Sequence, residues 1–219
     1  MAYTYGFMNM VTSFGFTKRW RNQCLNAIEI SSNSVVLDLM SGMGELSPSI
    51  AERMGKGQII ALDISEEMCI RAKKQEICHG VEYEVMQADF LNCPLEDNSI
   101  DFIFSSFGLK TFDLEQMKTI AIHIERILKP GGEFSFLEIS VPSNPLIKIP
   151  YLFYIAYVIP FLGRVFLGNP ENYRLLGVYT KLFGNCDATI EVFENAGLQV
   201  EPKSYFFGCA TGFTGKKPD

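Results

Sequence analysis

The sequence predicts an α/β fold with a mostly parallel, doubly wound sheet and helices on both faces. Short β-branched runs alternate with helical patterns along most of the chain, and acidic residues stand where three of the predicted strands end. The 219 residues are 47% apolar and 20% charged, which suits one domain with a sizeable buried core. We therefore expect residues 1–219 to form a single domain.

The first half of the chain is predicted to start with a helical cover over residues 1–30, with its clearest helical pattern from about Met8 to Ile30. Three strands and two helices follow. The strands are expected at Val35–Leu37, Ile59–Leu62 and Val81–Val85, and the helices at Glu45–Met54 and from Ser65 to about Cys78. Ser65 before Glu66 and Glu67 predicts a capped helix start with an acidic first turn.

The second half of the chain continues the alternation. Strands are expected at Ile100–Ser105, Phe134–Ile139, Val200–Phe207 and Ala210–Lys216, and helices at Leu114–Leu128 and Asp187–Ala196. The first of these helices shows apolar residues at helical spacing, and Pro130-Gly131-Gly132 predicts its end. These elements complete the predicted sheet.

An apolar segment, Leu146–Leu167, interrupts this rhythm inside an insertion that spans residues 144–185. It is uncharged between Lys148 and Arg164, but it contains two prolines. A membrane-spanning helix needs roughly 20 apolar residues, and this run is shorter. We favour a lid over an apolar pocket that can also contact a membrane surface. A core helix and a membrane-spanning helix are the alternatives.

Composition argues against several classes of protein. The formal net charge is −6, with no basic patch of the kind that binds nucleic acid. Lys18, Arg19 and Arg21 are expected to form a solvated face. The six cysteines form no C-x-x-C pair and only two histidines are present, so no metal site is expected. Unpaired cysteines are typical of cytoplasmic proteins. Residues 1–10 carry no basic charge ahead of an apolar run, so no secretory signal is predicted.

A ligand site is predicted at the carboxyl ends of the strands, where open α/β sheets bind their ligands. Asp38 ends the first strand, and Gly42 and Gly44 follow it in a loop before a helix. Glycine lets the backbone approach a ligand closely, and a helix N-terminus favours a negative group. A glycine pair alone is a weak signal.

Two further acids make this prediction more specific. Asp63 ends the second strand, where a carboxylate can accept hydrogen bonds from both hydroxyls of a ribose. Asp89 follows the third strand and can accept from an adenine amino group, and Phe90 can pack on the ring. Each acid alone could be a helix cap. Together they predict a nucleoside ligand. Ser47 stands where a dinucleotide fingerprint needs its third glycine, which weakens the alternative of NAD.

Several motifs resemble one known family. They are Tyr5-Gly6-Phe7-Met8-Asn9, Val36-Leu37-Asp38-Leu39 with the glycine loop, Ser106-Phe107-Gly108-Leu109, Leu128-Lys129-Pro130-Gly131-Gly132 and Asn172-Tyr173-Arg174-Leu175-Leu176. Over nearly its whole length the chain resembles the ubiquinone/menaquinone biosynthesis C-methyltransferases, a branch of the class I methyltransferases that use S-adenosylmethionine (SAM). The family usually has Arg-Asn where Lys110-Thr111 stand here, which predicts a changed acceptor.

The resemblance implies a Rossmann-like class I methyltransferase with a seven-stranded sheet, an apolar helical lid and SAM as cofactor. The residues that it implies for cofactor binding are Tyr5, Met8, Asp38, Gly42, Gly44, Asp63, Ile64, Asp89, Phe90 and Ser106. Those that it implies for catalysis are Lys110, Tyr5, Tyr173 and Arg174, with Lys110 stabilising an anionic acceptor.

The function that follows is methyl transfer from SAM to a small apolar or aromatic acceptor, with C-methylation of a quinol-like ring as the specific hypothesis. One alternative is an N- or O-methyltransferase of a lipid amine or secondary metabolite. Another is a SAM-binding partner protein without turnover. The expected location is the cytoplasm, with peripheral contact at the inner face of a membrane through residues 146–167, and a homodimer is left open.

Overall fold

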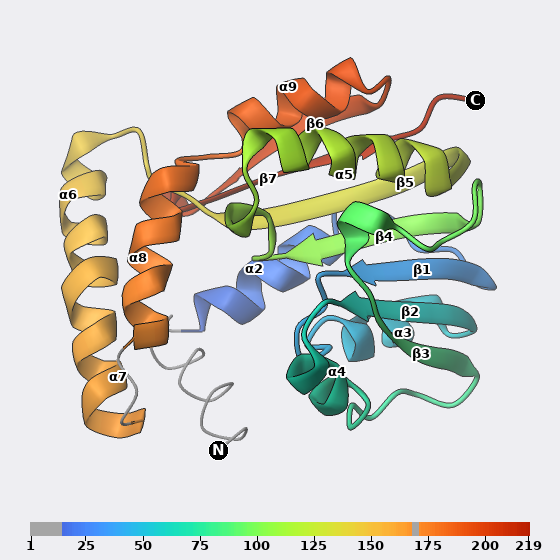
Figure 1. Ribbon diagram of the computed structural model, residues 1–219, viewed down its shortest axis with the longest axis horizontal. Coiled ribbons are helices and arrows are strands. Elements are labelled where there is room, and N and C mark those ends of the chain that lie inside the picture. The colour runs from blue at the N-terminus through green and yellow to red at the C-terminus, as the bar shows by residue number, and fades with distance from the viewer. Residues whose placement is uncertain (1–14, 168–170) are drawn as a thin grey trace.

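The computed structural model describes residues 15–167 and 171–219, and its centre is a seven-stranded sheet with the order β3-β2-β1-β4-β5-β7-β6 (Figure 1). The strands are β1 (Ser34–Leu39), β2 (Gly57–Asp63), β3 (Val81–Gln87), β4 (Ile100–Ser106), β5 (Leu128–Ile139), β6 (Gln199–Tyr205) and β7 (Ala210–Lys216). Strands β1 to β5 pair in parallel, and β7 is antiparallel to both of its neighbours. The predicted mostly parallel sheet is confirmed.

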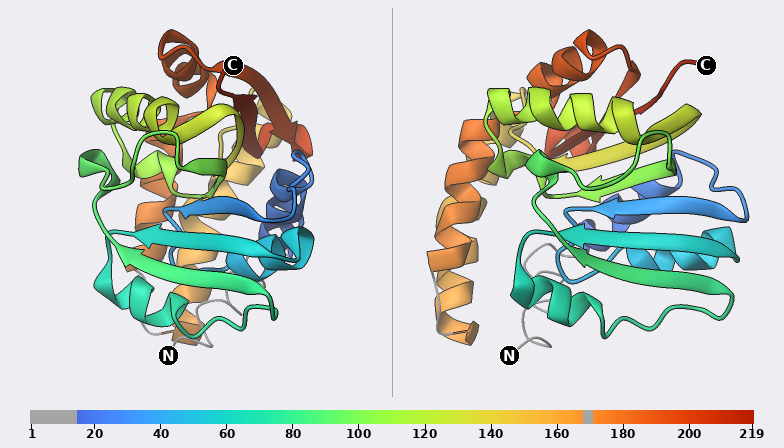
Figure 2. Two further views of the ribbon diagram at one scale, coloured as in Figure 1. Left: turned by 90° about the vertical axis from the view of Figure 1, so that its right-hand side faces the viewer. Right: turned by 45° about the vertical axis from the view of Figure 1, so that its right-hand side comes forward.

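Helices cover both faces of the sheet (Figure 2). They are α2 (Phe16–Leu25), α3 (Ser47–Met54) and α4 (Glu66–Ala72) on one face, and α5 (Leu114–Ile127) and α9 (Asp187–Asn195) on the other. Alternate residues of a strand face opposite sides. Leu37 and Ile103 therefore join the core beneath α5 and α9, whereas Val36 and Phe104 join the core beneath α2 and α3.

The helix after β2 is shorter than predicted. Ser65 caps its start as expected, because its hydroxyl accepts the Met68 amide at 3.4 Å. The helix ends at Ala72 rather than near Cys78. The chain turns there, and the Gln75 side-chain amide reaches across to donate to the Met43 carbonyl at 2.7 Å. A contact with the glycine loop therefore accompanies the early end of the helix.

The Pro130-Gly131-Gly132 stretch was expected to separate a helix from a strand, and the structure places it inside β5. Leu128 already pairs with Ile100, and the register then shifts before Phe102 pairs with Glu133. Gly131 has a φ of 71°, which the bulge requires and which glycine adopts without strain. The strand therefore begins directly after α5.

The insertion forms helices that stand across the carboxyl ends of the strands (Figure 1). They are α6 (Pro145–Phe153), the π-helical turn η3 (Tyr154–Val158), α7 (Ile159–Leu167) and α8 (Glu171–Phe183), with α8 packed against η3 and α7. The segment Pro145–Leu162 is long and apolar enough to cross a membrane by length and composition, with a mean hydropathy of 1.6. Only 11% of it is buried, so the alternative of a core helix is wrong.

Candidate active site

A cavity of about 1060 Å³ lies at the carboxyl edge of the sheet, between the strand ends, α2 and the lid. Ligand pockets commonly measure roughly 300–1,000 Å³, so this one has room for two ligands. Asp63 and Asp89 contribute carboxylates to its wall, while Tyr151, Ile155 and Ile159 of the lid contribute an apolar surface. The cavity therefore offers both a polar and an apolar binding surface.

Asp63 is held by two backbone amides at the end of β2. Its Oδ2 accepts the Gly42 amide at 2.8 Å, and its Oδ1 accepts the Ser65 amide at 2.9 Å. Each carboxylate oxygen can accept a second hydrogen bond. The carboxylate is fixed in the cavity wall and retains the capacity to bind two ribose hydroxyls.

The glycine loop leaves space for a ligand. Gly42 has a φ of 55°, and a Cβ at this position would meet no atom within 4 Å. Ile64, the next residue after Asp63, is 66% exposed beside the cavity. Open space over the loop, a fixed carboxylate and an exposed apolar side chain fit the ribose and adenine of SAM.

Asp89 caps a turn and also lies in the cavity wall. It caps a short turn, since its Oδ1 accepts the Leu91 amide at 3.0 Å and its Oδ2 accepts the Asn92 side chain at 3.2 Å. It also lines the cavity, together with Phe90, which packs edge-on against His123 at 5.9 Å between ring centroids. Asp89 and Phe90 therefore both line the cavity, and their contact with adenine stays a prediction.

Asp38 and Gly44 lie beneath the glycine loop and not in the cavity wall. Asp38 is 1% exposed and accepts the Ser47 hydroxyl at 2.6 Å. Burial raises its pKa from 3.8 to about 7. Gly44 has a φ of 72°, and a Cβ there would lie 2.7 Å from the Tyr83 hydroxyl. Both residues support the loop, and their predicted role in cofactor binding stays a prediction.

Arg21 is a cavity residue that the sequence interpretation missed. Its guanidinium forms an ion pair with Glu45 at 2.5 Å, donates to the Ser106 hydroxyl at 3.3 Å and lies 5.2 Å from the centre of the Phe107 ring. All four of these residues line the cavity. The predicted solvated face holds for Lys18 and Arg19, which are exposed, and is wrong for Arg21.

A signal for Arg21 was present in the sequence. It lies one residue after the buried Trp20 and three before the buried Cys24. Residues three and four apart share a helix face, so this spacing places Arg21 on the covered side of α2. A charged residue at such a position needs a partner, and Glu45 supplies it.

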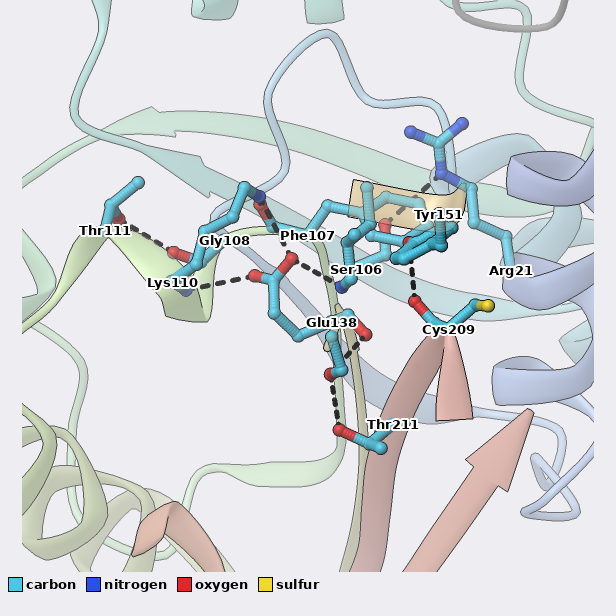
Figure 3. A network of polar contacts seen from close by, with 12 residues as sticks. Arg21, Ser106, Phe107, Gly108, Lys110, Thr111, Glu138, Tyr151, Cys209 and Thr211 are labelled. Atoms are coloured by element: carbon cyan, nitrogen blue, oxygen red, sulfur yellow. Dashed lines mark hydrogen bonds and ion pairs between the residues drawn. The ribbon is translucent and has the colours of Figure 1, made fainter. Parts of the chain in front are cut away.

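Lys110 lies in the cavity wall and is paired. Its side chain is only 10% exposed, and its ammonium donates to Glu138 Oε1 at 3.0 Å and to the Phe107 carbonyl (Figure 3). Glu138 is fully buried and also accepts the amides of Lys110, at 3.0 Å, and of Ile139, at 2.7 Å. Lys110 is therefore a largely buried, paired lysine.

For the remaining predicted residues, either the whole residue or its side chain lies outside the described part of the structure. Tyr5 and Met8 precede residue 15. Tyr173 and Arg174 belong to α8, but their side chains are not among those described. Within the described residues no group of three or more His, Cys, Asp or Glu could hold a metal ion.

The lid presents neutral groups to the cavity. The Tyr151 hydroxyl donates to the Cys209 carbonyl at 2.8 Å, which ties α6 to the start of β7. Burial raises the pKa of Tyr151 above its usual range and that of the Cys209 thiol to about 11. Both groups are therefore protonated at neutral pH, and this part of the wall carries no charge.

The fold and site together define a class I SAM-dependent methyltransferase. A SAM-dependent methyltransferase from Aquifex aeolicus has a similar structure, with a TM-score of 0.61 and 20% identity, covering 90% of this chain and 88% of that one. Phosphoethanolamine N-methyltransferase 2 of Haemonchus contortus, solved with SAM, has a TM-score of 0.60 and 16% identity, covering 96% and 58%. The predicted fold class is confirmed.

The chain belongs to the ubiE/COQ5 methyltransferase family, whose sequence model matches residues 1–217. Demethylmenaquinone methyltransferases of Bacillus cereus (strain ATCC 10987 / NRS 248) and Bacillus anthracis (strain CDC 684 / NRRL 3495) are each 29% identical to it over 218 residues, which are 98% of this chain and 91% of theirs. The chain is a methyltransferase with SAM as its cofactor, and the alternatives of a NAD-binding domain and of a partner protein without turnover are set aside.

Proposed function

We propose that this enzyme transfers the methyl group of SAM to a ring carbon of a quinol-like acceptor. The observation that carries the proposal is the composition of the cavity, which has room for two ligands and combines carboxylates at the strand ends with an apolar lid surface. The name of the relatives, demethylmenaquinone methyltransferase, supports an acceptor of this class.

The polar end of the cavity is suited to the cofactor. In this proposal Asp63 binds the ribose hydroxyls, Asp89 binds the adenine amino group, and Ile64 packs on the ring. The Arg21–Glu45 ion pair offers opposite charges for the carboxylate and the ammonium of the methionine moiety. Bound SAM supplies a methyl group that its own positive sulfur has already activated.

The remaining task of the protein is alignment and exclusion of water. The new bond forms between the acceptor carbon and the methyl carbon. The bond between the methyl carbon and sulfur breaks at the same time, and the electron pair of the broken bond goes to sulfur. The ring carbon then gives its proton to a water molecule, and aromaticity returns. Lys110 lines the cavity, and its ammonium has a third donor with which it can bind an acceptor oxygen that carries negative charge as the ring carbon attacks.

A direct test is incubation of the enzyme with SAM and one candidate acceptor at a time, read by mass spectrometry. We expect a prenylated quinol to gain the mass of one CH₂ unit, with S-adenosylhomocysteine formed in equal amount. Ethanolamine lipids and catechols are the comparison substrates for N- and O-methylation. A gain of one CH₂ unit by those substrates, with no gain by any quinol, would contradict the proposal.

The outer face of the lid supports a second part of the proposal, which is contact with an anionic lipid surface on the cytoplasmic side of a membrane. Five large apolar side chains on this face are 58–84% exposed: Leu146, Ile149, Phe153, Tyr157 and Phe161. The only charges in residues 139–170 are Lys148 and Arg164, both exposed, although the whole chain carries −6. An apolar segment whose charges are both positive, on an acidic protein, is complementary to anionic lipid.

Vesicle sedimentation tests this contact. Wild-type protein is expected to bind phosphatidylglycerol vesicles more tightly than phosphatidylcholine vesicles. Each cation near an anionic surface contributes about 1 kcal/mol, so Lys148→Glu with Arg164→Glu should lower binding by at least about 30-fold. Phe153→Ser with Phe161→Ser should also release the protein.

Ile122→Ser is the matched control, because Ile122 is 59% exposed on α5, away from the lid. It should leave binding to the vesicles unchanged. A second copy of this chain on the lid face is the competing occupant. A stable dimer in lipid-free sedimentation that Phe153→Ser with Phe161→Ser dissociates would contradict the membrane contact.

A further inference from the structure

Glu138 is a fully buried carboxylate near the carboxyl end of β5. It accepts two backbone amides, from Lys110 and Ile139, and the Lys110 ammonium (Figure 3). A buried carboxylate is costly unless it is paired and hydrogen-bonded, and these three donors meet that need. Glu138 therefore connects β5 to the short turn η2 (Leu109–Thr111) that follows β4.

The two members of this ion pair face different surroundings. Lys110 lines the cavity, and Glu138 does not. The Glu138 side chain is fully buried, whereas the Lys110 side chain is 10% exposed. An ammonium has three N–H donors, of which two go to Glu138 and the Phe107 carbonyl. Glu138 is thus placed to act on a bound acceptor only through Lys110.

The segment that carries Lys110 is constrained on each side. Phe107 has a φ of 67°, which is rare for a non-glycine residue, and its amide donates to the Leu137 carbonyl at 2.8 Å. A Cβ on Gly108 would lie 2.7 Å from the Met40 side chain. The Lys110 ammonium donates to the Phe107 carbonyl and so links the two ends of residues 107–110. The ion pair of Lys110 with Glu138 therefore holds this part of the cavity wall in place, together with the charge of Lys110.

We infer that Glu138 is a positioning residue for methyl transfer, which holds the Lys110 ammonium at the cavity wall so that it can donate to the acceptor oxygen. This inference rests on the proposed function. It explains how lysine, a flexible point charge, can provide directional binding, because its buried partner replaces the preorganisation that the planar fork of arginine has by itself.

A double-mutant cycle tests the inference, using Glu138→Gln, Lys110→Met and the variant with both changes. Glu138→Gln should lower kcat for the acceptor by about 10–100-fold and leave SAM affinity within about twofold, because the charge that binds the acceptor loses its alignment. In the Lys110→Met background the same change should lower kcat no further.

Thermal unfolding of the same variants separates positioning from stability. Lys110→Met leaves the buried Glu138 carboxylate without its ion-pair partner, so the Tm of this variant should fall. Adding Glu138→Gln in that background should restore the Tm. Glu133→Gln, the same chemical change in the middle of β5 and outside the cavity wall, is the control and should leave kcat unchanged. Wild-type kcat in Glu138→Gln, or an equal further loss in the Lys110→Met background, would overturn the inference.

An optical probe makes the test independent of turnover. With S-adenosylhomocysteine present, 4-nitrophenol bound by wild type should show more of its coloured phenolate form than when bound by Glu138→Gln or Lys110→Met. Equal phenolate fractions would count against the inference. Failure of the proposed function would appear in the wild type, as absence of quinol methylation, and is thereby distinguishable.

Discussion

Asp63→Ala is expected to weaken SAM binding by about 10–100-fold. A hydrogen bond to a charged group contributes about 1.5–3 kcal/mol, and the ribose hydroxyls are proposed to bind this carboxylate. The substitution also frees the Gly42 and Ser65 amides that Asp63 now accepts, which loosens the glycine loop. Isothermal calorimetry with SAM measures the change.

Two further variants serve as controls for the loss of SAM affinity in Asp63→Ala. Asp63→Asn keeps one oxygen acceptor and should lose less affinity than Asp63→Ala. Asp97→Ala removes a surface aspartate that pairs with Arg126 at 2.5 Å, outside the cavity, and should bind SAM as wild type does. Unchanged affinity in a folded Asp63→Ala variant would rule out the assigned role.

The free energy of unfolding of the SAM-free enzyme should fall between pH 4 and pH 8 because of Asp38. Its pKa is about 7 in the folded chain, against an ordinary 3.8, so the folded state holds the proton more tightly than the unfolded state does. The contribution is fully present below about pH 4 and is lost as pH rises through 7. A shift of this size corresponds to about 4 kcal/mol as an upper value.

Asp38→Asn removes this titration and still offers an oxygen to the Ser47 hydroxyl. Its stability relative to wild type should therefore be greater at pH 8 than at pH 5, whatever the absolute cost of the buried amide. Urea unfolding of both proteins at the two values checks this. Parallel stability curves across the range would show that Asp38 does not titrate there.

Most of the fold could be predicted from the sequence because its signals are local. The buried parallel strands appear as short apolar runs such as Ile59–Leu62, and Ser65 marks a helix start by its own hydrogen bond. Asp63 and Asp89 reach the cavity because the carboxyl ends of parallel strands share one edge. These features depend on little beyond neighbouring residues.

Other features depend on contacts between distant segments. Asp38 was expected to end the first strand and lies one residue before the end of β1, but the Ser41 amide donates to the Leu62 carbonyl at 3.0 Å and lays the loop over it. Arg21 faces the cavity because Glu45 lies 24 positions further along the chain and meets it there. Glu138 meets Lys110 across 28 positions. No local pattern specifies such pairs, since the sheet must form before they exist.

The position of β7 has a consequence for how this protein folds. It follows β6 in the chain but lies between β5 and β6 in the sheet, and β7 is the strand with which β6 pairs among the described residues. One edge of β5 and one edge of β6 therefore stay unpaired until β7 lies between them. In the sequence, β7 is far from its partner β5. Long-range pairing is slow. The pairing of β5, β7 and β6 should therefore be the last part of the sheet to form.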